Sequence, residues 1–539
     1  MLFNSYIFIF VFLPIVICVF YILGNKGHHR VAISWLVASS FFFYGWWNPI
    51  YIILLLSSIL FNYTFGILLT SNDVRWSKSW VLIVGIIANV SLLGYFKYAN
   101  FFVENINAFF GTGLILETII LPLAISFFTF QQIAYLVDAS RGDTHEYSFL
   151  HYCLFVTFFP QLIAGPIVHH RETIPQFESE ETYKFKYSNI TIGLAIFSLG
   201  LFKKIIIADG MATYANPVFD AAETGVTISF FEAWSASIAY AFQLYFDFSG
   251  YSDMAIGIAR MFGILLPINF NSPFKARDII DFWRRWHITL TRFITSYIFT
   301  PLSMPLMRFA LTRKLGLWSQ FWLSVAIPVM IAFVIAGFWH GAGWTFILFG
   351  VIHGIYLVIN YSWLQIKKNI FNSKTNDNSI LWKFIGRGIT IFAILFSFVI
   401  FRAESLEGAN EVLQGMLGLN GFILPDRYLL KLNSIANLGD HLHNIGWLFV
   451  PNGILGFTGT MQIFYSLVLF VIVVYAPNTQ QIMLKFKPFF ENKDIEIKPI
   501  KLKFLEWKPT RLYGFVFGIF MAICVLKLGE VSEFIYFQF

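Results

Sequence analysis

Apolar residues form long runs along this chain, and most polar residues gather in the short segments between them. A helix needs about 20 apolar residues to cross a bilayer, and the clearest runs approach that length. They are Ser5–Gly24, Ser79–Tyr95, Glu117–Val137, Phe149–Val168, Ile190–Ile207, Trp318–Phe338 and Leu512–Leu526. With shorter and Pro- or Gly-interrupted runs included, the pattern predicts roughly eleven to sixteen membrane elements, some of them re-entrant. We therefore expect an all-α polytopic membrane protein. Its first run lacks a basic start and a cleavage motif, and is expected to be a retained helix.

The composition of the chain agrees with this pattern. Of its 539 residues, 57% are hydrophobic and only 12% are charged, about half the charged fraction of a soluble protein. The net charge of +7 lies largely in short loops. No basic soluble face with interleaved aromatic residues is present, so nucleic acid is not an expected partner.

Basic residues flank the apolar runs unevenly, which indicates an orientation. Lys26 and Arg30 follow the first span and Arg75 follows the third, whereas the turn at Trp47–Pro49 has no basic residue. Because cytoplasmic loops carry the excess of Lys and Arg, we expect the N-terminus outside. Residues 210–226 contain no Lys or Arg and are expected to form an external loop.

Polar residues within apolar runs concentrate in the middle of the chain. Residues 1 to about 115 are plain spanning helices, and from about 406 polar loops alternate with apolar spans. Residues 116–405 hold nearly all the intramembrane polar groups. Such groups are costly in hydrocarbon and mark functional sites, so we expect the functional core in 116–405 of a single 539-residue membrane domain.

Two stretches of this block indicate hydrogen bonding or a cavity wall. In Ser126–Asp143, Gln131 interrupts an apolar helix, where it either bonds to a neighbouring helix or lines a cavity. In Phe158–Glu172, Pro160 and the Ala164–Pro166 stretch interrupt a hydrophobic segment, which we expect to be kinked or broken. Irregular backbone at membrane depth is tolerated against protein or a water-filled cavity, so either a simple kink or a cavity wall is consistent with it.

Two further stretches carry charge. Tyr245, Asp247 and Asp253 lie in Gln243–Gly257, where structural hydrogen bonding and the lining of a substrate channel are equally good interpretations. The stretch Lys275–Phe293 mixes arginines and aspartates with aromatic residues and cannot cross hydrocarbon. An interfacial anchor would explain its tryptophans, Trp286 among them, and its arginines. It would not explain the histidine that follows, His287.

The stretch "AGFWHGAGWTFILFGVIHG" places His340 and His353 in an otherwise lipid-like context. In a continuous helix they would lie roughly 20 Å apart, too far to act on one bond. Gly341 and Gly343 predict a break after His340, which would further separate the two environments. We therefore expect the partner of His340 to come from another helix, with His287 the best candidate. His353 is expected to be a packing or hydrogen-bonding residue.

The sequence does not predict a metal site. Eleven histidines are present, but no HExxH or other compact ligand set occurs. The pairs His28–His29 and His169–His170 sit at polar edges and are expected in loops.

Several of these stretches resemble the membrane-bound O-acyltransferase family, in particular its bacterial branch of alginate O-acetyltransferases and teichoic acid D-alanyl transfer proteins. The stretches are "FFPQLIAGP", "QLYFDFSGYSDMAIGIARMFGI", "DFWRRWHITLTRFI", "GFWHGAGWTFILFGVIHG", "YAPNTQQIM" and the terminal "EFIYFQF". The resemblance places the family's invariant histidine at His340 and its second residue at His287. It implies an annular multi-helix bundle with broken or re-entrant helices around a central cavity, and a catalytic core in residues 116–405.

The resemblance also implies a chemistry. An acetyl group would move from a cytoplasmic thioester donor, acetyl-CoA or an acylated carrier, to a hydroxyl of an extracytoplasmic polysaccharide, directly or through an extracytoplasmic acetyltransferase partner. The protein would lie in a bacterial inner membrane and bind no resident cofactor. A histidine near its usual pKa suits removal of the hydroxyl proton, so we expect His340 to be the general base and His287 to orient it or stabilise the oxyanion. Candidate cavity-lining residues are Gln131, Tyr245, Asp247, Trp286 and Trp339.

Other functions remain open from the sequence. The same fold could transfer D-alanine, or acetyl groups to peptidoglycan. A polysaccharide transporter or export channel would predict inverted repeats with matching broken helices, and the sequence contains none that we can detect.

Overall fold

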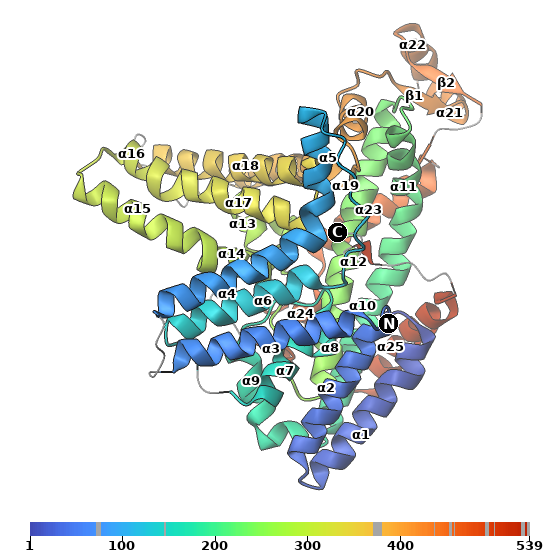
Figure 1. Ribbon diagram of the computed structural model, residues 1–539. Helices are drawn as coiled ribbons and strands as arrows, with labels where there is room; N and C mark the ends of the chain where they lie inside the picture. Colours follow the sequence, from blue (N-terminus) through green and yellow to red (C-terminus); the bar gives the residue numbers. More distant parts are fainter. Residues whose placement is uncertain are drawn as a thin grey trace.

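The chain forms an assembly of helices in this computed structural model, which describes residues 1–539 except 72–76, 145–146, 370–379, 436, 452–454, 458, 491–494, 501, 530–533 and 536–539 (Figure 1). Within the described residues, seven helical segments are long and apolar enough to cross a membrane. They are Phe8–Asn25, Tyr51–Thr70, Lys78–Phe110, Tyr187–Glu223, Leu317–His340, Trp344–Asn369 and Leu381–Arg402. This confirms the predicted all-α membrane fold, and shorter or more polar helices fill the space between the seven.

The N-terminal part of the chain forms helices that pack in two groups. Its elements are η1 (Phe8–Phe12), α1 (Leu13–Asn25), α2 (His29–Gly45), α3 (Tyr51–Thr70), α4 (Lys78–Leu93), the π-helical turn η2 (Gly94–Tyr98), α5 (Ala99–Phe110) and α6 (Ile125–Ser140). The helix α1 packs on α2, while α3, α4 and α6 lie side by side (Figure 1). The predicted span Glu117–Val137 is wrong in its first part. Its helix begins only at Ile125, after Pro122 and a left-handed Ala124 (φ 62°).

A broken segment follows α6 and confirms the predicted interruption. Its helices are α7 (Phe149–Thr157), α8 (Phe159–Leu162), α9 (His170–Glu178) and the 3-10 turn η3 (Glu180–Tyr183). The helix stops at Phe158, just before Pro160, and residues 163–169 are irregular. These residues are nevertheless almost wholly buried, so protein and not lipid surrounds the irregular backbone.

The centre of the molecule is a close helix pair. Its elements are α10 (Tyr187–Phe202), the π-helical turn η4 (Lys203–Ala208), α11 (Asp209–Glu223) and α12 (Phe230–Met261). A Cβ at Gly193 would lie 2.5 Å from the Gly257 carbonyl, and one at Gly200 would lie 2.6 Å from that of Gly250. Glycines seven residues apart on both helices therefore let the backbones touch. The expected external loop at residues 210–226 is wrong, because α11 occupies most of it.

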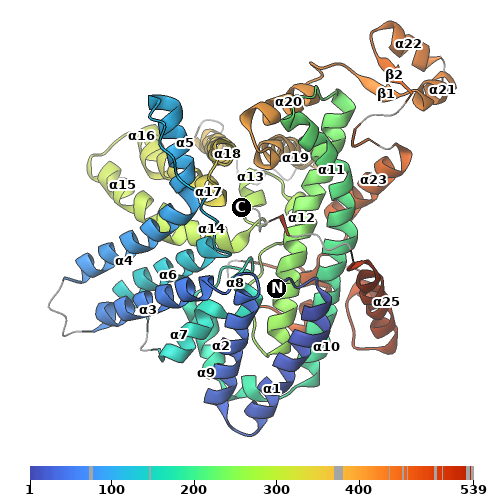
Figure 2. The ribbon, with the colours of Figure 1, turned by 45° about the vertical axis from the view of Figure 1, so that its right-hand side comes forward.

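The next helices carry the histidines. They are η5 (Pro273–Lys275), α13 (Ile279–Trp283), α14 (Ile288–Ile294), η6 (Thr295–Phe299), α15 (Thr300–Thr312), α16 (Leu317–Phe321), η7 (Trp322–Ala326), α17 (Ile327–His340), α18 (Trp344–Asn369) and α19 (Ile380–Arg402). The helices α17 and α18 form an antiparallel hairpin that projects with α15 and α16 from the central pair (Figures 1 and 2).

The last part of the chain adds a small lobe and further helices. Its elements are α20 (Leu406–Met416), β1 (Ile423–Pro425), α21 (Arg427–Asn433), α22 (Leu438–Asn444), β2 (Leu448–Val450), α23 (Thr460–Tyr475), α24 (Thr479–Ile482), η8 (Leu484–Phe486), η9 (Lys503–Leu505) and α25 (Arg511–Lys527). The two strands pair in parallel, and with α21 and α22 they form a lobe beyond one end of α12 (Figure 2). The final helix α25 packs on α10.

Candidate active site

His340 and His287 come from different helices and lie next to each other. Their ring centroids are 6.4 Å apart, and both residues are buried. His340 is the last residue of α17, and His287 precedes the first residue of α14. The Trp339 indole lies 5.0 Å from the His340 ring and 6.0 Å from the His287 ring, centroid to centroid. The structure thus brings together the pair that the sequence singled out.

The end of α17 is set by the glycine after His340. Gly341 is extended (φ −165°), and a Cβ there would collide with the Phe346 ring. The predicted break after His340 is therefore confirmed. It leaves the His340 ring at the end of the hairpin, between Trp339 and Phe401, whose ring centroid lies 5.2 Å away.

A hydrogen-bond network fixes the ring of His287. Its backbone is left-handed (φ 43°), and its Nδ1 lies 3.1 Å from Asn269 Oδ1. That oxygen also accepts from the Thr289 hydroxyl (2.9 Å) and the Thr289 amide (3.3 Å), so it is an acceptor. Nδ1 must then carry the proton and donate it, which leaves the lone pair of the neutral ring on Nε2.

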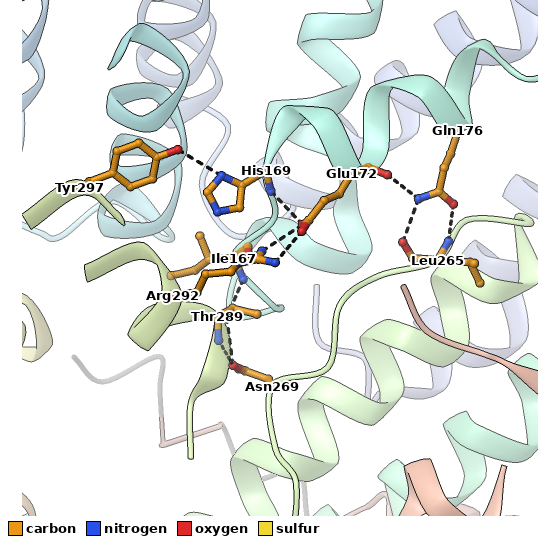
Figure 3. Close-up of polar contacts among 9 residues, drawn as sticks. All are labelled: Ile167, His169, Glu172, Gln176, Leu265, Asn269, Thr289, Arg292 and Tyr297. Carbon is orange, nitrogen blue, oxygen red and sulfur yellow. Dashed lines mark hydrogen bonds and ion pairs between the residues drawn. The ribbon is translucent and has the colours of Figure 1, made fainter. Parts of the chain in front are cut away.

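The same network ties the broken segment to α14. The Thr289 hydroxyl accepts from the Ile167 amide (3.0 Å), and Arg292 forms a two-pronged ion pair with Glu172, with 3.0 Å between Nη2 and Oε2 (Figure 3). Arg292 Nη2 also reaches the Ile167 carbonyl (3.4 Å). Irregular backbone near the histidines is thereby held by side chains of α9 and α14.

His353 is closer to His340 than the sequence predicted. The break folds α18 back along α17, and the Phe349 ring lies 6.2 Å from the His340 ring and 4.4 Å from that of His353. The further separation expected from the glycine break is therefore wrong, because the break turns α18 back against α17. The ring of Phe349 packs against both histidine rings.

Both ring nitrogens of His353 are nevertheless occupied. Trp283 Nε1 donates to Nδ1 (3.1 Å), so Nε2 carries the proton and donates to Ser397 Oγ (2.9 Å). Ser397 in turn donates to the Ile394 carbonyl (2.9 Å). This closed network holds α13, α18 and α19 together and matches the structural interpretation of His353.

Asp247 and Asp253 are engaged in ion pairs within the bundle. Asp247 Oδ1 lies 2.7 Å from Lys204 Nζ, and both side chains are buried. Asp253 Oδ2 pairs with Lys203 Nζ (2.6 Å) and also accepts from Thr479 (2.7 Å). These carboxylates bind α12 to η4 and α24, which agrees with the structural alternative that the sequence left open for both of them.

The remaining candidates, Gln131, Trp286 and Tyr245, are all buried. Gln131 is buried on α6, next to Phe130, whose ring stacks on Trp339 (5.4 Å). It is the adjacent Gln132 that bonds to a neighbouring helix, through Ser58 Oγ (2.8 Å). Trp286 stacks on Phe282 (5.5 Å), and the Tyr245 ring lies 6.3 Å from that of Trp286.

The expected loop position of His170 is wrong. His170 is 1% exposed, and its ring bridges Tyr147 Oη (2.9 Å) and Asp138 Oδ2 (3.1 Å). Tyr297 Oη links the same carboxylate (2.9 Å) to His169 Nδ1 (3.1 Å). The presence of Asp138 in an apolar helix was the sequence signal for this cluster, because a buried carboxylate needs partners.

Two residues near the histidines were missed by the sequence interpretation. Asn269, which orients His287, lies in a loop and has no distinguishing pattern around it. Lys97 did leave a signal, since it is a cation in the interior of a long apolar segment. Its Nζ lies 3.1 Å from the His340 carbonyl oxygen.

Two cavities are lined by different groups of elements. One of about 610 Å³ is lined by Trp46, Trp47, Ser126 and Ile163 among others. Another of about 980 Å³ is lined by residues of the α13 region, α18, α19 and the segment after α24. Its basic residues, Arg277, Arg284, Arg285, Lys367, Lys383 and Lys498, outnumber its acidic ones, Asp278, Asp281 and Glu496. No cluster of three metal-ligating side chains occurs among the described residues.

Comparison with known proteins decides the family. Residues 68–401 match the model of the membrane-bound O-acyltransferase family. The chain belongs to this family. It is therefore an O-acyltransferase and, with its seven long apolar helices, a multi-pass membrane protein.

Relatives of the chain act on different polymers, as their names state. A peptidoglycan O-acetyltransferase of Helicobacter pylori is 44% identical over 79% of this chain and 81% of its own. A probable alginate O-acetylase of Pseudomonas putida is 32% identical over the full length of both chains. A teichoic acid D-alanyltransferase of Streptococcus thermophilus is 30% identical over 52% of this chain and 68% of its own.

Proposed function

We propose that this membrane-bound O-acyltransferase moves an acetyl group from a cytoplasmic thioester to a hydroxyl of a cell-envelope polysaccharide, directly or through an extracytoplasmic acetyltransferase partner. The observation that carries the proposal is the adjacency of two buried histidines from different helices, one with its tautomer fixed. The catalytic core lies in residues 116–405, and the protein resides in the bacterial cytoplasmic membrane.

His340 acts as the general base in this proposal. It removes the proton from the acceptor hydroxyl as the oxygen attacks the thioester carbonyl. When the tetrahedral intermediate collapses, the carbon–sulfur bond breaks and His340 returns that proton to the departing sulfur, which leaves as the thiol. His287 has the orienting role, because its Nδ1–H is donated to Asn269 and its Nε2 is an acceptor in the neutral ring. Of the two roles expected for His287, this tautomer supports orientation over donation to an oxyanion.

The donor enters through the charged cavity beside α13. Two adjoining cavities, of about 980 and 260 Å³, share Arg277, Arg285 and Lys498 in their lining. Positive charge suits both the cytoplasmic side of a membrane protein and a phosphate-bearing donor, either acetyl-CoA or an acylated carrier. The acceptor reaches the histidines from the cavity at Trp46 and Trp47, on the side expected to face outwards.

This sidedness has a direct test. In a variant with its native cysteines replaced, Arg284→Cys should react with an impermeant thiol reagent only from the cytoplasmic face, and Trp47→Cys only from outside. Labelling of Arg284→Cys from outside would overturn the proposed topology.

Peptidoglycan is the favoured acceptor. The 44% identity to a peptidoglycan O-acetyltransferase exceeds the 30–35% identity to the alginate O-acetylases. Alginate-like polysaccharide is the second candidate, because two alginate O-acetylase relatives match the chain over its whole length. Deletion of the gene should remove O-acetyl groups from muropeptides measured by mass spectrometry. Loss from a secreted polysaccharide, with muropeptides unchanged, would reverse the order.

A further inference from the structure

The last carbonyl groups of α17 accept hydrogen bonds from side chains that lie about 240 residues earlier in the chain. The last carbonyls of a helix have no partner within it. Lys97 Nζ donates to the Trp339 carbonyl (2.6 Å) and the His340 carbonyl (3.1 Å). Tyr98 Oη donates to the Phe338 carbonyl (2.7 Å), and the two rings stack at 4.0 Å. Two consecutive residues thus satisfy three consecutive carbonyls, including that of His340.

The ammonium group of Lys97 is fully engaged by these bonds. It has three N–H donors, and the third reaches Ser126 Oγ on α6 (3.3 Å). A cation at the C-terminus of a helix also interacts favourably with the helix dipole. Because every donor has a protein partner, Lys97 is suited to holding α17 against α6 and not to binding a substrate.

The local backbone conformation around Lys97 favours a functional role for this lysine. Lys97 and Tyr98 lie in η2, a π-helical turn within the long α4–η2–α5 segment. Such turns are frequent at functional sites, and a charged side chain in a membrane-spanning segment is costly unless it serves one. The segment also begins with Lys78, an exposed lysine that makes a natural comparison.

We propose that Lys97 is a positioning residue for His340, with Tyr98 as its assistant. Together they hold the last turn of α17, and with it the His340 ring, at a fixed place opposite His287. This inference rests on the proposed role of His340. A displacement of about 1 Å in a catalytic group can cost about 100-fold in rate without weakening substrate binding.

The test compares purified Lys97→Met, Lys97→Arg and Lys78→Met proteins in acetyl transfer, at equal amounts of folded protein. For Lys97→Met we expect kcat to fall tenfold or more, with the KM for the acetyl donor within about twofold of the wild type. Lys97→Arg keeps the charge and the donors and should recover most of kcat. Lys78→Met should match the wild type.

Three results would overturn the inference. The first is an unchanged kcat in Lys97→Met. The second is a rise in the KM of Lys97→Met with no fall in kcat, which would make Lys97 a donor-binding residue. The third is a Lys97→Arg variant whose kcat is no higher than that of Lys97→Met. If Lys97→Met does not insert, Tyr98→Phe and Ser126→Ala each remove one bond, and unchanged kcat in both would overturn it equally.

A fully active His340→Ala would instead contradict the proposed function. An inactive His340→Ala with full kcat in Lys97→Met would remove only this inference.

Discussion

His340 and His353 are two buried histidines on one helical hairpin, and they differ in their surroundings. The His353 ring bonds to Trp283 and Ser397, one partner for each nitrogen. The His340 ring ends its helix opposite a second histidine, whose tautomer is fixed from behind by Asn269. Burial and sequence context are alike for both, so the partners of the ring distinguish a structural histidine from a candidate catalytic one.

The largest expected effect follows from removing His340. His340→Ala should abolish acetylation of the polymer, a loss of about 1,000-fold or more, because no base remains beside the acceptor hydroxyl. The measurement is the acetyl content of the polymer in cells that express the variant at wild-type abundance. Normal acetyl content would reject His340 as the base.

A smaller loss is expected from His287. His287→Ala should reduce kcat about 100-fold, because an orienting group contributes less than the base itself. Purified enzyme and single-turnover kinetics would separate this from an effect on donor binding. Full activity of His287→Ala together with an inactive, normally abundant His353→Ala would exchange the roles of the two histidines.

The network behind His287 predicts a graded effect at Asn269. Asn269→Leu removes the acceptor of the Nδ1 proton and should lower kcat about tenfold, whereas Asn269→Asp retains an acceptor oxygen and should lose less. If the two variants lose activity equally, Oδ1 does not orient His287.

The smallest effect on activity should come from His353. His353→Ala leaves the Trp283 donor buried without its acceptor, so stability should fall by about 1–3 kcal/mol while kcat per folded molecule stays near the wild-type value. Thermal unfolding in detergent, measured beside kcat, checks both parts. A stable but inactive protein would place His353 in the chemistry.

The fold and part of the site could be read from the sequence, for identifiable reasons. Proline at position 160 and glycine at 341 act through the local backbone, so the breaks near them were predictable. The proximity of His353 to His340 and the links from Asn269 and Lys97 depend on which helices pack together. A local pattern holds no information of that kind, and an apolar run also cannot reveal where its helix begins, as Ile125 shows.

One paired measurement tests whether His340 performs the chemistry while His353 does not. Purified His340→Gln and His353→Gln, matched for folded protein, are compared for the rate of acetyl transfer from a labelled donor. We expect that His353→Gln stays within about threefold of the wild type, whereas His340→Gln loses about 1,000-fold or more. Equal losses, or an active His340→Gln beside an inactive His353→Gln, would contradict it.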